Sequence, residues 1–352
     1  MMEKENVPLN LSLPSKLSSS TINKRNEKNE TSKPKCSKKE TFLVNWINTI
    51  LAKPEQFNAN LLGVSNTENE MASVDNMQIV LDSVRVSSGF KAIHNEVQDG
   101  GFIMRSDSDL YKNLVNQQAL FEILDSYEEE YLLFGLNAII GEAVPKNGFL
   151  SKKNIHAFVC EKILSSKRKP VQENHIKKSN KLIIKKIFQL VLYLDVARES
   201  MALPNLCLFN KTAICKSSKD IAIHFCKNFL QGEGDIIRHL GVLGVKLNFE
   251  QTYVHEFDYA TASVFNDLKD GVRLARLIEI LSGARGLSNC LRVPPVSRLQ
   301  KLHNVGVCIA KVYTPTEEQP ESKCIVEGNP EKTVAFLTRI INMYDADTAG
   351  KL

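Results

Sequence analysis

The spacing of apolar residues along the chain is the first guide to its fold. Residues 41–51 and 110–124 carry apolar side chains at intervals of three and four, the pattern of a helix with one buried face, and residues 131–140 are expected to form a helix buried on most sides. In the first run, Thr41 is the expected N-cap, and Trp46, the single tryptophan, is expected in a core. Helices fit these runs better than strands do.

Helix signals are clearest in the C-terminal third of the chain. Residues 217–220 fit a capping box, Asp267 or Asp270 is placed to cap the next helix, and Asn329-Pro330 opens the last one. A further helical run, SRLQKLHNVGVCIAKV, follows a double proline. These four amphipathic helices predict a small all-α domain from about 217 to 345.

Polar segments suggest how the chain is divided. Residues 1–40 hold no aromatic residue and are rich in Ser, Thr, Asn, Lys and Glu. Such a segment cannot bury enough apolar area to offset its chain entropy, so we expect a disordered, basic tail. A helical region over 41–205 then precedes a domain over 206–345, and 346–352 form a C-terminal tail. The predicted fold class is all-α.

Composition places the chain among soluble globular proteins. Apolar residues make up 43% and charged residues 24%, which are average values for that class. The longest strongly apolar run, Ile187–Leu194, is far shorter than the roughly 20 residues that cross a bilayer, and the N-terminus lacks the apolar segment of a signal peptide. We therefore expect no membrane partner and a cytoplasmic or nuclear location. Eight irregularly spaced cysteines indicate reduced thiols.

Several short motifs invite an enzymatic interpretation. The Asp267 and Asp270 carboxylates could act as acid and base or bind Mg²⁺, but helix capping explains them better. The glycine-rich QGEGDIIRHLGVLG lacks the lysine of a phosphate-binding loop, and His255, Glu256 and Asp258 fit a helix start or a turn. We expect neither an enzyme nor a cofactor nor a bound metal. A catalytic cleft assembled from distant residues stays open at this stage.

A basic stretch over 162–186 is the main candidate for binding, since it holds nine lysines and arginines and a single acid, Glu173. It is either a solvated helical surface or a contact for a polyanionic polymer such as tubulin, actin or nucleic acid. Nucleic acid is not an expected partner, because no interleaved aromatic residues are present to stack on bases. Together with four basic residues expected on exposed faces of later helices, the candidate contacts are Lys167, Arg168, Lys169, Lys177, Lys178, Arg273, Arg276, Arg298 and Lys301.

A second short motif lies at the N-terminus. Lys4, Glu5 and Asn6 match the KEN degradation motif that a mitotic ubiquitin ligase reads. A tripeptide also arises by chance, so both interpretations stay open.

Three stretches resemble, in order, helices of a calponin-homology domain: DLKDGVRLARLIEIL, RVPPVSRLQKLHNVGVCIAKV and GNPEKTVAFLTRIINMY. In that family an Asp-Gly step opens the central core helix, here Asp270-Gly271, and a Leu-x-Asn-Val segment lies in the next helix, here Leu302–Val305. FLVNWINTIL, the run from Cys215 to Thr252 and LRVPPVSRLQKLHNV are similar to the first calponin-homology region of the abnormal spindle family. The GEGDIIRHLGVLG block resembles that family in particular.

The resemblance implies a non-enzymatic cytoskeletal protein that binds microtubules and acts at spindle poles and microtubule minus ends in mitosis, with spindle-pole proteins as partners. It implies a location on the cytoskeleton, at the spindle pole or centrosome, or in the interphase nucleus. Family members also carry IQ repeats, and none is found in this sequence, so calmodulin is not an expected partner. An actin-binding module and a scaffold without direct polymer contact are the alternatives.

Overall fold

The described part of the protein, in a computed structural model, comprises residues 38–52, 73–141, 151–164, 173–200, 206–232, 234–345 and 348. Within these ranges the chain is all-α, as predicted, and extended residues pair only as isolated bridges, such as that between Tyr127 and Phe209. The tail predicted over 1–40 lies outside the described residues as far as residue 37, and so does the Lys4-Glu5-Asn6 motif. Nearly all of the predicted C-terminal tail lies outside them too.

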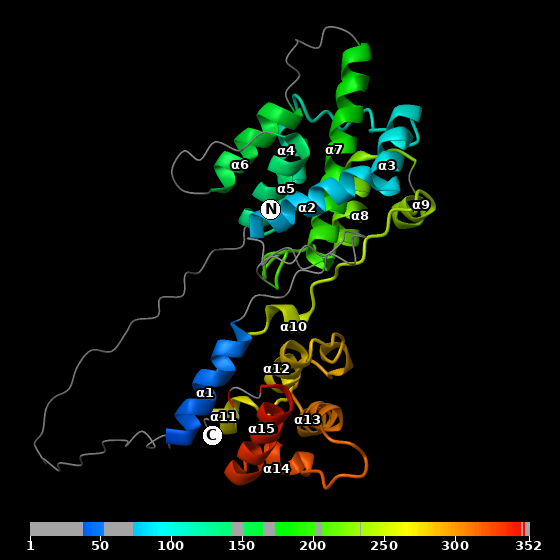
Figure 1. The fold of residues 1–352 in the computed structure, drawn as a ribbon. Helices are drawn as coiled ribbons and strands as arrows, with labels where there is room; N and C mark the ends of the chain where they lie inside the picture. Colours follow the sequence, from blue (N-terminus) through cyan, green and yellow to red (C-terminus); the bar gives the residue numbers. More distant parts are fainter. Residues whose placement is uncertain are drawn as a thin grey trace, which may run out of the picture.

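Two separate clusters of buried side chains organise the helices. The first core gathers residues between Met77 and Phe249. The second core joins residues 43–50 to residues between Val264 and Ile341. Figure 1 shows the first core as the upper group of helices and the second as the lower group, with α10 (Tyr253–Glu256) between them.

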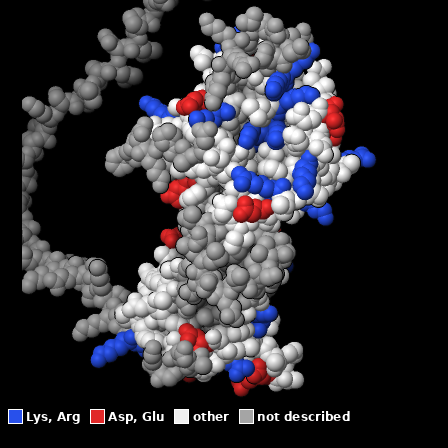
Figure 2. Space-filling view, turned by 45° about the horizontal axis from the view of Figure 1, so that its top comes forward, with Lys and Arg blue, Asp and Glu red and all other residues white. Residues whose placement is uncertain are grey.

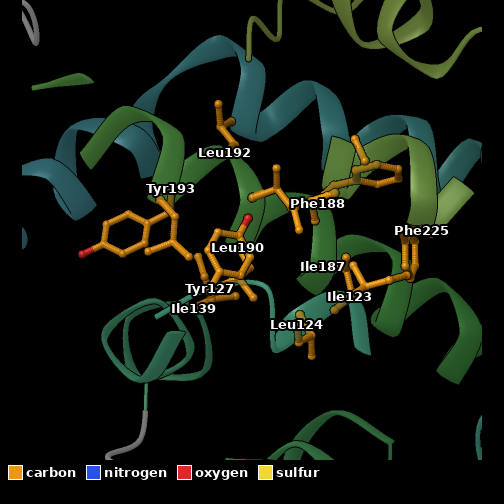
Figure 3. Packing of buried hydrophobic residues seen from close by; sticks show 14 of the residues in the cluster. Ile123, Leu124, Tyr127, Ile139, Ile187, Phe188, Leu190, Leu192, Tyr193 and Phe225 are labelled. Carbon is orange, nitrogen blue, oxygen red and sulfur yellow. The ribbon is translucent and has the colours of Figure 1, made fainter. Parts of the chain in front are cut away.

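The first core is built around α7 (Glu173–Glu199), a helix of 27 residues. The other helical segments of this core are α2 (Ser73–Val86), α3 (Ser88–Asp99), α4 (Leu114–Leu124), α5 (Glu129–Ile140), α6 (Lys152–Val159), the π-helical η2 (Cys160–Leu164), α8 (Ser218–Phe229) and α9 (Ile236–Val242). Every residue of the apolar run Ile187–Leu194 is buried. Figure 3 shows part of this packing, in which Phe188 of α7 meets the edge of Phe225 of α8 at a centroid distance of 5.6 Å. The run is therefore core packing.

Helix α5 lies against α7 at Gly135. A Cβ built on Gly135 would come within 2.5 Å of Cδ1 of Leu190 and within 3.1 Å of the Leu194 side chain. Real Cβ atoms do not approach so closely in a well-packed interior. The missing side chain of Gly135 thus sets the separation of the two helices.

The second core is built from segments far apart in the sequence. Its helices are α1 (Lys38–Leu51), α11 (Val264–Asp267), α12 (Val272–Ser282), the 3₁₀ turn η3 (Ser288–Cys290), α13 (Arg298–Val312), α14 (Ser322–Val326) and α15 (Pro330–Tyr344). All three stretches that resemble calponin-homology helices lie in this core, which fits a domain of that type. Asn329 caps α15 through the backbone N–H of Lys332, as predicted.

Helix α1 departs from its expected start while its buried face agrees with the prediction. The buried residues of α1 are Leu43, Trp46, Ile47 and Ile50. The helix begins at Lys38, so Thr41 lies inside it and the prediction of Thr41 as N-cap was wrong. The last three residues of the predicted tail are therefore helical.

The two cores group the helices differently from the predicted ranges 41–205 and 206–345. Helix α1 packs in the second core, beside α11 and α12, whereas α8 and α9 pack in the first. The capping box of α8 is formed by Ser217 and Asp220, as predicted. Its apolar stripe, however, faces α4 and α7. Helical spacing identifies a buried face but not the core that covers it.

The Asp270-Gly271 step and Asn304 form the centre of the second core. Asn304 is fully buried; its Oδ1 accepts a hydrogen bond from the Arg292 N–H at 2.7 Å, and its Nδ2 donates to Asp270 O at 3.0 Å and to Arg292 O at 3.2 Å. Gly271 has φ 77°, and a Cβ there would lie 2.7 Å from Cβ of Asn304. Only glycine combines this positive φ with so close an approach. The start of α12 is thus fixed against α13.

Residues 250–263 link the two cores. At the first core, Gln251 Oε1 accepts hydrogen bonds from the N–H groups of Leu208 and Phe209 at 2.9 and 2.8 Å, and Gln251 is itself buried. At the second core, the Asn48 side chain of α1 exchanges two 2.9 Å hydrogen bonds with the backbone of Thr261. Both ends of this linker are therefore held by side-chain amides.

Replacing Asn304 with alanine tests the central hydrogen bonds of the second core. Asn304→Ala leaves buried backbone groups of Asp270 and Arg292 without partners, so we expect a loss of about 2–4 kcal/mol in the free energy of unfolding. Urea unfolding followed by tryptophan fluorescence measures it, because Trp46, the single tryptophan, lies in the second core.

Asn342→Ala is the matched control, since Asn342 is exposed on α15. We expect it to change the same transition by less than about 0.5 kcal/mol. Equal effects of the two variants would contradict the central role of Asn304.

Candidate functional site

Each of the paired aspartates accepts backbone hydrogen bonds beside a helix start, but the N-cap of α11 is Ser263 and that of α12 is Gly271, so neither aspartate is the predicted N-cap. Asp270 Oδ1 accepts a hydrogen bond from the Val272 N–H at 2.9 Å, at the start of α12. Asp267 Oδ2 accepts from the N–H groups of Ala262 and Ser263 at 2.7 and 2.8 Å, just before α11. The described residues contain no group of three or more His, Cys, Asp or Glu that could hold a metal ion.

The His255 and Glu256 cluster is likewise structural. Nδ1 of His255 accepts a hydrogen bond from the Thr252 N–H at 2.9 Å and closes a capping box at the start of α10, as the helix-start interpretation predicted. Glu256 pairs with Lys216 at 2.5 Å and accepts from Gln251 at 2.8 Å. Partial burial raises the pKa of Glu256, but the hydrogen bonds from Lys216 and Gln251 and the positive charges of Lys216 and Lys211 together lower it below its usual value. These groups join α10 to the first core.

Arg273 does not lie on an exposed face, so that expectation was wrong. Its side chain is only 13% exposed. The guanidinium donates hydrogen bonds to the carbonyls of Asp258 at 2.8 Å, Ala260 at 2.9 Å and Asp267 at 3.1 Å. It also lies 4.8 Å from the centroid of the Phe257 ring. Arg273 therefore ties the linker to the start of α12.

Arg276 is also largely enclosed, again against expectation. Its side chain is 15% exposed and lies 3.7 Å from Glu279, which is 10% exposed. Glu279 in turn accepts hydrogen bonds from the N–H and hydroxyl of Ser288 at 2.8 and 2.7 Å. The Arg276 charge is thus neutralised inside the second core.

Arg298 and Lys301, the other two candidates of the second core, lie near its surface on α13. Arg298 is 58% exposed but forms an ion pair with Glu327 at 2.7 Å. Burial raises the pKa of Asp270 above its usual value, and the positive charge of the half-buried Lys301 opposes that rise. Both candidates therefore already face acidic side chains of the same core.

Helix α7 presents the remaining candidates. Lys177 and Lys178 are exposed in its first turns, as expected, whereas Lys167, Arg168 and Lys169 lie outside the described residues. Between Glu173 and Lys186 the helix holds five lysines and no further acid. Figure 2 shows Lys and Arg side chains gathered on the first-core half of the molecule. We call Lys177, Lys178, Lys181, Lys185 and Lys186 the α7 basic surface.

One arginine from a distant segment extends this surface. Arg85 of α2 donates to Ala138 O of α5 at 3.0 Å, and Lys186 donates to the next carbonyl, Ile139 O. Burial lowers the pKa of Lys186, and the charges of Lys185 and Arg85 lower it further. Two cations at the C-terminal carbonyls of α5 complement the negative end of its helix dipole. Sequence analysis missed Arg85, because no local pattern links it to residues about a hundred positions away.

Of three comparisons with known proteins, the one with curated proteins gives matches. Curated abnormal spindle-like microcephaly-associated proteins match it at 33% identity over 289 residues, which is 77% of this chain, in Canis lupus familiaris, Colobus guereza and Homo sapiens. The chain belongs to the abnormal spindle family. It spans 8% of the length of these relatives. No family model and no solved structure matches the chain.

The matched family is the one that the sequence resemblance indicated. The match to that family extends over 77% of the chain. Within the described ranges, no helix combines the length and apolar character needed to cross a membrane.

The different environments of Arg273 and Arg298 predict different costs of substitution. Arg273→Ala removes hydrogen bonds to three carbonyls and a ring contact, so we expect it to lower the free energy of unfolding by about 2–3 kcal/mol. Arg298→Ala removes an exposed ion pair, for which about 0–1 kcal/mol is expected. Urea unfolding followed by Trp46 fluorescence compares the two variants.

Arg273→Lys separates charge from geometry. An ammonium cannot reproduce the planar fork of a guanidinium, so this variant should lose most of the stability that Arg273→Ala loses. Full stability of Arg273→Lys would show that only the charge matters.

Proposed function

We propose that this chain is a non-enzymatic microtubule-binding module of the mitotic spindle that acts at spindle poles and microtubule minus ends. Relatives whose names refer to the spindle support a spindle-related role. The α7 basic surface supports direct contact with an acidic polymer, and it is the observation on which the proposal rests. Its location is then the spindle pole or centrosome, with spindle-pole proteins as further partners.

The physical basis of the contact is the charge distribution of α7. Five lysines lie within 14 residues of a helix that is anchored in a core by the apolar run Ile187–Leu194. This support keeps the lysines together on one helix, so their charges act on the same partner. Each exposed ion pair contributes only about 0–1 kcal/mol, so binding requires several at once. Such attraction is screened over roughly 8 Å at physiological ionic strength and is salt-sensitive.

The second core contributes less to this contact. Arg273 and Arg276 are enclosed, and Arg298 pairs with Glu327. A polymer that bound these arginines would first have to displace their present partners. The proposal therefore assigns the polymer contact to α7 of the first core and leaves the second core to hold the linker and α1.

Neutralising two exposed lysines tests the proposal. We expect Lys177→Gln with Lys178→Gln to weaken binding of the full chain to stabilised microtubules several-fold at low salt, because two charges of the α7 basic surface are lost. Cosedimentation across a salt series measures the dissociation constant, and a parallel series uses actin filaments.

The matched control is Lys311→Gln with Lys323→Gln, which removes the same charge from exposed positions of the second core. It should bind microtubules as the unaltered chain does. Equal weakening by both double variants would indicate a net-charge effect and contradict the α7 assignment. Binding to actin alone would replace the proposal with an actin-binding module, and binding to neither polymer would leave a scaffold.

A further inference from the structure

The connection between α13 and α14 carries a motif that the proposed function does not use. Residues 313–321 contain Thr314-Pro315, the one position in the sequence where Ser or Thr precedes Pro. These residues are not helical, and Thr314, Pro315 and Thr316 are all exposed. In Figure 1 this connection is the orange loop that projects from the second core between α13 and α14.

Thr314 lies beside charged side chains that are linked to one another by hydrogen bonds and an ion pair. The Thr314 N–H donates a hydrogen bond to Glu317 Oε2 at 2.8 Å, and the Thr314 hydroxyl lies 3.2 Å from the Thr316 hydroxyl and also interacts with the Glu317 carboxylate. Glu317 Oε1 lies 2.6 Å from a guanidinium nitrogen of Arg339 on α15. That guanidinium lies 5.5 Å from the centroid of the Tyr313 ring. The Glu317 carboxylate and the Arg339 guanidinium thus lie near the exposed Thr314 hydroxyl.

We propose that Thr314 is a phosphorylation site for a proline-directed protein kinase and that its phosphate takes Arg339 from Glu317. The Thr314 Oγ1 attacks the γ-phosphorus of ATP, the bond from that phosphorus to the β-phosphate oxygen breaks, ADP leaves, and the hydroxyl proton passes to a base of the kinase. This inference does not rest on the microtubule contact, because it concerns the second core and another reaction.

The charges around Thr314 favour this exchange of partners. A phosphothreonine carries about −1.5 to −2 charges at neutral pH and three acceptor oxygens. The hydrogen bond from Thr314 lowers the pKa of Glu317, so its carboxylate is ionised at neutral pH and repels the new phosphate. Arg339 is the nearby cation, and guanidinium binds phosphate in a bidentate manner. Releasing Glu317 therefore relieves repulsion while Arg339 keeps an anionic partner.

The exchange would also alter a groove on the second core. Arg339 lines an open groove of about 820 Å³ together with residues of α1 and α15, among them Lys39, Glu40, Val334 and Asn342. A changed direction of the Arg339 side chain would change the charge along one wall of this groove. The modification thus connects an exposed loop to a surface formed by α1 and α15.

The first experiment treats the full chain with a recombinant proline-directed kinase of the mitogen-activated class and ATP, and locates phosphate by mass spectrometry. We expect close to one phosphate per chain at Thr314, and at least a tenfold loss of incorporation in Thr314→Ala and Pro315→Ala. Thr316→Ala is the matched control and should retain full incorporation. Undiminished labelling of Thr314→Ala, or a folded chain labelled tenfold less than a peptide of residues 309–322, would overturn the proposal.

The second experiment tests the exchange of partners by ³¹P NMR of the phosphorylated chain. Pairing with Arg339 should lower the second pKa of the phosphate by about half a pH unit or more, relative both to Arg339→Gln and to the unaltered chain unfolded in urea. The urea comparison needs no variant and remains valid if Arg339→Gln fails to fold. Identical phosphate pKa values in the folded and urea-unfolded chain would show that Arg339 stays with Glu317.

Discussion

The arrangement of the second core depends on the side-chain amide of Asn304. That amide accepts a hydrogen bond from the Arg292 N–H and donates to the carbonyls of Arg292 and Asp270. The Asn304 side chain is fully buried. Gly271 lets it approach, because any Cβ there would meet Asn304 and Val305. A buried amide with all three hydrogen bonds made fixes one geometry, since each alternative leaves a polar group unpaired. The positions of α12 and α13 follow from it.

The second core also imposes a constraint on the whole chain. Asn48 of α1 binds the backbone of Thr261, so the residues of the first core lie within the loop that this contact closes. Closing a connection of more than two hundred residues carries an entropic cost that grows slowly with length and slows folding more than it weakens the folded state. Hydrogen bonds from Gln251 and Arg273 hold the linker at the first and second core, which limits the conformational freedom of the linker.

Local patterns predicted the helices well and their partners poorly. The Ser217 and Asp220 capping box, the Asn329 cap and the buried face of α1 depend on residues within a few positions of each other, and the structure has all three. The packing of α8 in the first core and the enclosure of Arg273 depend on residues elsewhere in the chain. Nothing in the spacing of VRLARLIEIL distinguishes an arginine that reaches solvent from one that reaches carbonyls before the helix. The candidate surface was predictable on α7, where charge alone defines it.

The chemistry of arginine and lysine is consistent with the roles proposed for the two cores. A guanidinium is weakly hydrated and presents donors in a fixed plane, so Arg273 can satisfy three carbonyls and lie against an aromatic ring with little exposure. An ammonium is strongly hydrated and stays at the end of a flexible stem, as at the exposed Lys178 on α7. The buried contacts of Arg273 hold one geometry, and they would be broken if Arg273 bound a polymer. The second keeps charge available over a range of positions, which suits an acidic surface whose negative groups are not fixed in place.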